Sequence, residues 1–115
     1  MGDRANVLIS GVYLYTHWGG RHLPFIVRDA LKKKWRWDDD AYLTRIVFCE
    51  MVKGQEAEET GFGICSYMPD NEHPVIELNC DNQTITIGSV TKTFEEYAAM
   101  DDGELQEFLY GGVNW

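Results

Sequence analysis

The sequence lacks the features that assign a chain to the membrane or to the secretory pathway. No apolar run approaches the roughly 20 residues of a membrane-spanning helix. The first residues have neither the basic start nor the long apolar stretch of a secretion signal. Position 6 is Asn, where a myristoylation signal beginning at Gly2 needs Ser or Thr. We therefore expect a soluble, cytoplasmic protein.

Cysteine is scarce and is not spaced for a disulfide framework or a zinc site. Cys49, Cys65 and Cys80 are an odd number, and no C-x-x-C pair occurs. His17 and His22 are also not the i, i+4 helical pair of zinc proteases. We expect three buried, reduced thiols, with no metal and no cofactor.

Positive charge is scarce and unevenly distributed. The chain has ten Lys and Arg residues against nineteen Asp and Glu, a formal net charge of -9. Residues 1–37 hold seven of these cations and two of the acids, so the remaining three cations and seventeen acids lie in residues 38–115. This balance disfavours binding to a nucleic-acid backbone. It remains compatible with a short anionic ligand at a basic spot.

The apolar pattern predicts the first three elements. Val7–Thr16 is rich in β-branched and aromatic residues, which favours a long strand with a bulge or bend at Gly11. A helix with Pro24 in its first turn follows, and a second helix begins near Asp38–Asp40 and ends at Gly54. Their buried faces are expected to comprise Leu23, Ile26, Val27, Ala30 and Leu31, and then Tyr42, Leu43, Ile46, Val47 and Met51.

Short strands and a capped helix are predicted in the second half. Turn residues separate Phe62–Met68, Val75–Leu78 and Thr84–Ile87, which indicates a meander of antiparallel hairpins. Thr93 and Glu96 have the spacing of a capping box. A length of 115 residues fits a single domain spanning residues 1–115. The order β-α-α-β-β-β-α predicts an α+β fold, an antiparallel sheet of about four strands packed against two main helices.

The stretch THWGGRH, residues 16–22, is the strongest candidate for a ligand site. Its glycines allow close backbone approach, and the following helix start favours an anion. Arginine can pair with phosphate, tryptophan can stack on a base, and histidine can donate or accept a hydrogen bond. The candidate ligand-binding residues are His17, Trp18, Gly19, Gly20, Arg21 and His22, with Trp37 and Arg45 as possible walls. A tight strand-to-helix turn explains the same residues, and Gly-Gly matches no dinucleotide or P-loop motif.

A basic and aromatic run, KKKWRWDDD at residues 32–40, suggests nucleic-acid contact when taken in isolation. Three aspartates follow at once, and a helix end, a connector and a helix start explain all nine residues. Trp35 and Trp37 point in opposite directions in an extended connector, so one is expected to pack while the other lines a cleft.

Several segments resemble a group of small, uncharacterised bacterial and phage-type proteins. The segments are LYTHWGG with the LP and LK that follow it, RWDDDAYLTRIVF, TGFGI and DNEHP, and the likeness runs from Tyr13 to Ile87. The resemblance implies a phage-like context, in which the protein would act in the host cytoplasm. It implies no catalytic residue.

These observations favour a non-catalytic module that binds a small anionic or nucleotide-derived molecule. In a phage-like setting such a module would sequester a host defence signal. One alternative is an acidic interaction or inhibitor module that binds a basic, nucleic-acid-binding protein through its carboxylates. Another is a small hydrolase that uses His73 or His17. The short strand edges also permit a homodimer.

Overall fold

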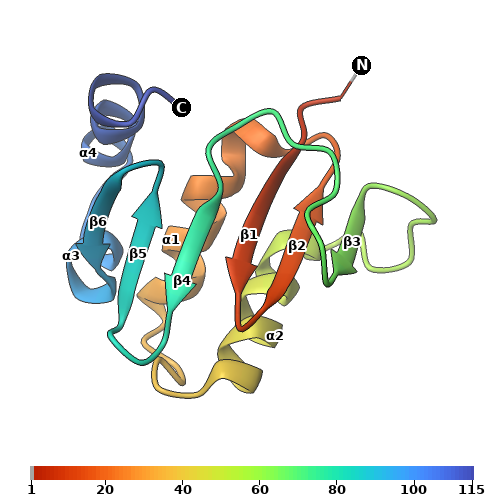
Figure 1. Cartoon of the computed structure of the whole chain (residues 1–115), viewed down its shortest axis with the longest axis horizontal. Helices are drawn as coiled ribbons and strands as arrows, with labels where there is room; N and C mark the ends of the chain where they lie inside the picture. Colours follow the sequence, from red (N-terminus) through yellow and green to blue (C-terminus); the bar gives the residue numbers. More distant parts are fainter. Residues whose placement is uncertain (1) are drawn as a thin grey trace.

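A six-stranded mixed sheet runs through the molecule in the order β3-β2-β1-β4-β5-β6, and α1, α2 and α3 lie behind it in the view of Figure 1. The computed structural model describes residues 2–115. The strands are β1 (Ala5–Ile9), β2 (Val12–Thr16), β3 (Phe62–Cys65), β4 (Ile76–Asn79), β5 (Thr84–Ile87) and β6 (Val90–Thr93). The helices are η1 (Gly20–His22), α1 (Leu23–Lys32), α2 (Asp40–Val52), α3 (Phe94–Ala98), α4 (Asp102–Glu107) and η2 (Phe108–Gly112).

The predicted long first strand is wrong, because the run Val7–Thr16 contains a hairpin turn. Ser10 and Gly11 both have positive φ, 53° and 78°, and join Ile9 directly to Val12. Positive φ at both central residues is the geometry of a two-residue hairpin loop. Gly11, which is predicted to mark a bulge or bend within one strand, therefore lies in the turn that reverses the chain.

The predicted antiparallel sheet of about four strands is also corrected. β1 pairs with β4 in parallel, and β6 adds a further strand after a turn at Gly88. Residues 66–75 do not form the expected hairpin turn, since they carry the chain from β3 past β2 and β1 to β4 (Figure 1). Turn residues predict that a chain bends, but not which strand it meets next. The α+β class itself is confirmed.

The helices begin and end close to where the sequence predicts. Asp39 caps α2, and the Thr93 side chain completes the predicted capping box at the start of α3. Asp101 completes a further capping box, at the start of α4, which was not predicted. Gly54, with φ of 82°, follows the end of α2. The prediction that Tyr42 belongs to the buried face of α2 is wrong, because its side chain is exposed.

The core lies between the sheet and the helices. Its largest fully buried side chains include Tyr97, Phe94, Leu14 and Ile76. The expectation of three buried thiols is wrong, since only Cys80 is buried, whereas Cys49 is exposed and Cys65 is half-buried; all three are free. Within residues 2–115 no helix has the length and apolarity to span a membrane.

Candidate functional site

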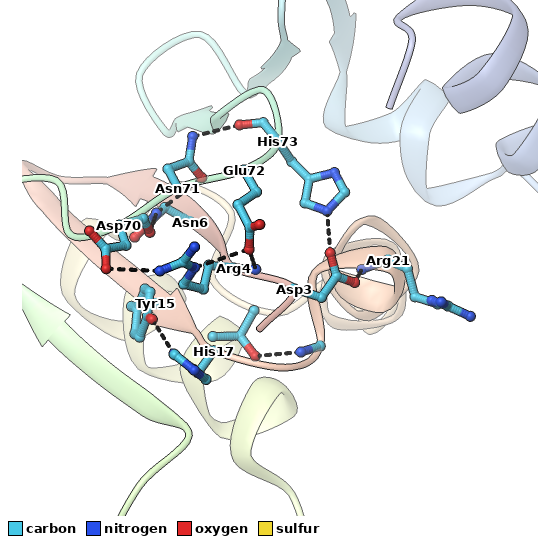
Figure 2. Close-up of polar contacts among 12 residues, drawn as sticks. Asp3, Arg4, Asn6, Tyr15, His17, Arg21, Asp70, Asn71, Glu72 and His73 are labelled. Carbon is cyan, nitrogen blue, oxygen red and sulfur yellow. Dashed lines mark hydrogen bonds and ion pairs between the residues drawn. The ribbon is translucent and has the colours of Figure 1, made fainter. Parts of the chain in front are cut away.

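The glycine turn between β2 and α1 holds an anion, and that anion belongs to the chain itself. The main-chain oxygen of Asp3 accepts a hydrogen bond from Gly20 N at 2.8 Å. One carboxylate oxygen of Asp3 accepts a second from Arg21 N at 2.7 Å (Figure 2). Free N–H groups at a helix start favour a negative charge. Asp3 satisfies these donors, which leaves them unavailable to a ligand.

His73 holds Asp3 from the other side. Its Nε2 lies 2.6 Å from the second Asp3 carboxylate oxygen, and its ring stacks on Trp115 with centroids 4.4 Å apart. Burial raises the pKa of Asp3, but the hydrogen bonds from His73 and from Arg21 N outweigh it, and the pKa lies below its ordinary value. Gly20 is required here, because an added Cβ would lie 2.5 Å from the Asp3 main-chain oxygen and 2.9 Å from the His73 ring.

The crossing segment 66–75 is fixed by the start of β1. Arg4 pairs with both Asp70 and Glu72 at 3.0 Å, and the buried Asn6 donates to the main-chain oxygen of Asp70 at 3.2 Å (Figure 2). Hydrogen bonds from the Arg4 side chain and main-chain N–H lower the pKa of Glu72. His73, one of the two histidines named in the hydrolase alternative, therefore joins parts of the fold through Asp3, and the neighbouring Glu72 does so through Arg4.

The structure does not bring the six candidate residues of the turn to one place. Trp18, Gly19 and His22 line a cavity of about 260 Å³, which we call the Trp18 cavity. His17 instead lies against the Tyr15 hydroxyl at 2.6 Å, and the Arg21 side chain is exposed and points away (Figure 2). The other lining residues of the Trp18 cavity are Thr16, Ile26, Met51, Gln55, Gly61 and Phe62. This cavity has no Lys or Arg in its lining, so it is poorly suited to an anion.

A second hollow forms where the α1–α2 connector meets α2, and we call it the basic groove. It has a volume of about 450 Å³. Its lining residues are Lys34, Trp35, Arg36, Tyr42, Arg45 and Ile46. Of the predicted ligand-binding residues, Arg45 alone lies here. Three cations and two aromatic rings thus share one surface.

The two tryptophans of the connector have different environments, as predicted, although the connector is not extended, since Lys34 and Arg36 have left-handed backbone. Trp37 donates its indole N–H to the Leu31 carbonyl at 3.1 Å and packs edge-on against Phe94. It anchors the connector and does not line the basic groove. Trp35 is 58% exposed in the groove, with the Lys33 ammonium 5.6 Å from its ring centre.

The backbone around Trp35 is strained. Lys34 and Arg36 have φ of 59° and 57°, a left-handed conformation that costs a non-glycine residue roughly 1–2 kcal/mol. Main-chain hydrogen bonds from Lys34 N to Leu31 O and from Asp39 N to Arg36 O hold this shape. Strained, fixed backbone is concentrated at functional sites in proteins.

The arginines of the groove differ from the structural arginines elsewhere. Arg4 and Arg28 are both bound to carboxylates. No carboxylate in residues 2–115 lies within 4.0 Å of Arg36 or Arg45. The Arg36 guanidinium instead lies 4.7 Å from the centre of the Tyr42 ring. The Arg45 guanidinium donates a weak hydrogen bond to Cys49 Sγ at 3.8 Å. Neither arginine is therefore neutralised by a carboxylate of the described chain.

The aspartates that follow the connector do not line the groove. Asp39 accepts the Tyr42 N–H at 2.9 Å as the cap of α2. Asp40 lies beside Cys80, and burial together with this carboxylate raises the pKa of the Cys80 thiol to about 12. The run KKKWRW is the sequence feature that indicates the groove, but the three aspartates that follow it carry the opposite charge and favour a structural explanation.

Among the described residues, 2–115, no three His, Cys, Asp or Glu side chains are grouped so that they could hold a metal ion. Comparison of the chain with protein-family models, with curated protein sequences and with solved structures found no match.

Proposed function

We propose that the protein is a non-catalytic module that binds a small anionic, nucleotide-type molecule, and that the ligand occupies the basic groove. The observation that carries this proposal is the pair Arg36 and Arg45, free of carboxylates beside two exposed aromatic rings. Of the three cations in the groove, Lys34 is paired with Glu95 at 3.2 Å. The two arginines therefore remain without a carboxylate partner, in a chain whose net charge is -9.

The side chains of the groove match the two halves of a nucleotide. A guanidinium presents paired donors to phosphate or carboxylate oxygens. An exposed indole offers a face on which a base can stack, worth about 1–3 kcal/mol per base. A volume of about 450 Å³ suits one small molecule, and the acidic remainder of the surface repels a longer polyanion.

Binding without turnover is favoured by what lines the groove. None of its described lining residues is a carboxylate, a histidine, a serine or a cysteine. General acid-base and nucleophilic catalysis mostly use such groups. Lysine can also serve, but Lys34 is held in an ion pair with Glu95 at 3.2 Å. Sequestration of a nucleotide-derived signal, the role that the phage-like resemblance suggests, requires only binding.

A thermal-shift screen followed by calorimetry tests the proposal. The probes are AMP, ADP-ribose, a cyclic dinucleotide and inorganic phosphate. A ligand at 100 times its Kd stabilises a one-site binder by about 2.7 kcal/mol. For a chain of this size that corresponds to a Tm increase of about 10 °C.

Matched variants locate the site. Arg36→Ala and Arg45→Ala are each expected to weaken binding by about 10- to 100-fold, through the loss of a charge-assisted hydrogen bond. Arg21→Ala removes the same charge from the glycine turn and is expected to leave the affinity unchanged. Loss of binding in Arg21→Ala alone would place the ligand at that turn instead.

The tryptophans provide a second matched pair. Trp35 and Trp18 are 58% and 55% exposed, so their replacement by alanine perturbs the fold to a similar extent. Only Trp35→Ala is expected to weaken binding of a probe that carries a base, and it should spare inorganic phosphate. The absence of any shift with all four probes would contradict the proposed function.

A further inference from the structure

The edge of the sheet formed by β3 takes no part in the proposed ligand site, yet it has the character of an interface. Seven large apolar side chains are exposed in residues 2–115, and four of them lie on or beside this edge. They are Trp18, which covers Gly61 directly before β3, and then Ile64, Tyr67 and Met68. Ile64 is 58% exposed and Tyr67 is 71% exposed.

The main chain of β3 is free along its outer side. β3 pairs with β2 alone, and within residues 2–115 no further main-chain hydrogen bond reaches it. In Figure 1 the loop between α2 and β3 lies on this side, beyond the start of the strand. Unpaired N–H and C=O groups along an edge strand form a ready template for another strand.

β3 is short, at four residues, which limits pairing, but this edge has no charged residue to protect it. Soluble proteins guard a free edge with charged residues, especially lysine. Residues 60–69 contain no Asp, Glu, Lys or Arg. The opposite edge strand, β6, carries Lys92. An uncharged, apolar edge of this kind is expected to be covered in the assembled protein.

A groove beside the start of β3 provides a place for apolar side chains. It has a volume of about 270 Å³, and Phe48, Val52 and Phe62 form its apolar lining. Thr60 and the solvated acidic loop before β3 form its rim.

We propose that a second copy of this chain covers the edge, through antiparallel pairing of β3 with β3 about a twofold axis. Antiparallel pairing places the end of one β3 beside the start of the other. The exposed Tyr67–Met68 end of each copy therefore lies next to the Phe48–Phe62 groove of its partner. One uncharged strand supplies both halves of the interface, which is the self-complementarity that a twofold contact requires.

The effect of salt on binding distinguishes a second copy of this chain from a strand of a basic protein. Each copy has a net charge of -9, so the two copies repel one another in dilute salt. Added NaCl is expected to strengthen pairing between copies. It would weaken binding of a basic partner to the acidic loop.

Sedimentation velocity of the full chain tests the proposal, from low micromolar to hundreds of micromolar protein at low and high NaCl. A reducing agent prevents disulfides through the exposed Cys49. We expect the mass to rise with concentration to twice that of one chain, and the dimer to tighten as NaCl increases.

Ile64→Lys and Tyr67→Lys are each expected to weaken the dimer about tenfold or more, since they replace buried apolar contact with a charge at the twofold axis. Tyr110→Lys is the matched control, because Tyr110 is 56% exposed and belongs to η2. This segment lies near the β6 edge of the sheet, away from β3 (Figure 1). Circular dichroism checks that each variant folds. Because Tyr67 is highly exposed, Tyr67→Lys is expected to fold even if Ile64→Lys does not.

A monomer under every condition would overturn the proposal and leave the edge to a strand of another protein. A dimer that Tyr110→Lys dissociates and the two edge variants do not would also overturn it.

Discussion

Replacing Gly20 with alanine is expected to destabilise the protein by about 1–3.5 kcal/mol, because the glycine turn is built around the missing Cβ. The added atom would lie 2.5 Å from the Asp3 main-chain oxygen and 2.9 Å from the His73 ring. Neither neighbour can move away easily from the added Cβ. Asp3 is held by hydrogen bonds from the turn, and the His73 ring is held by Asp3 and by stacking on Trp115.

The magnitude follows from three contributions. Overpacking a site that cannot relax costs about 1–3 kcal/mol. Lengthening the hydrogen bond from Gly20 N to Asp3 O, now 2.8 Å, costs about 1 kcal/mol. The lower entropy of alanine in the unfolded chain offsets about 0.4–1 kcal/mol.

Urea unfolding at neutral pH measures the effect. Gly111→Ala is the control, since a Cβ at Gly111 meets no atom within 4 Å. We expect a clear loss of stability in Gly20→Ala and little change in Gly111→Ala. Equal midpoints for the two variants would refute the conclusion that the turn is closed by Asp3 and His73.

Three further predictions concern the core and its titrating groups. Tyr97→Phe is expected to lose about 1 kcal/mol in urea unfolding, because the buried hydroxyl donates to the Pro24 carbonyl at 2.8 Å and this hydrogen bond is lost. Iodoacetamide is expected to modify the exposed Cys49 in the native protein and Cys80 only after unfolding, since burial raises the pKa of the Cys80 thiol to about 12. Mass spectrometry of the labelled peptides measures this, and equal labelling of both cysteines in the native protein would contradict it. Burial raises the pKa of Glu50, but the lysine ammonium 2.7 Å away outweighs it and the pKa lies below the ordinary 4.5. A lowered pKa contributes stability above about pH 4.5 that is lost as the pH falls. Glu50→Gln should therefore be less stable than the parent at pH 7 by about 1 kcal/mol, and a difference that persists undiminished at pH 3 would argue against this ion pair.

Much of the local structure was predictable because its signals are local. Asp39, Thr93 and Asp101 start helices through hydrogen bonds to residues three positions ahead. The strand Thr84–Ile87 matches its prediction residue for residue, since β-branched residues alternate between two turns.

The candidate site was less predictable from the same patterns. The run KKKWRW suggested an anionic partner, but its cations and the following aspartates stand side by side in sequence. Asp39 is used as a helix cap, as its position predicts, but only the fold places Asp40 beside Cys80 and leaves Arg36 without an ion pair to either aspartate. Arg45 reaches the same groove from α2.

The sequence by itself determined the α+β class and the two main helices with their caps. Those properties depend on side-chain pattern and on neighbours within a few positions. Tertiary structure alone decided that β1 pairs in parallel with β4, and that Asp3 takes the anion position at the glycine turn through a contact with His73, 70 residues away. It also decided which arginines stay free of carboxylates. The physical reason is that a hydrogen bond or an ion pair depends on the distance between atoms, and separation along the chain does not fix that distance.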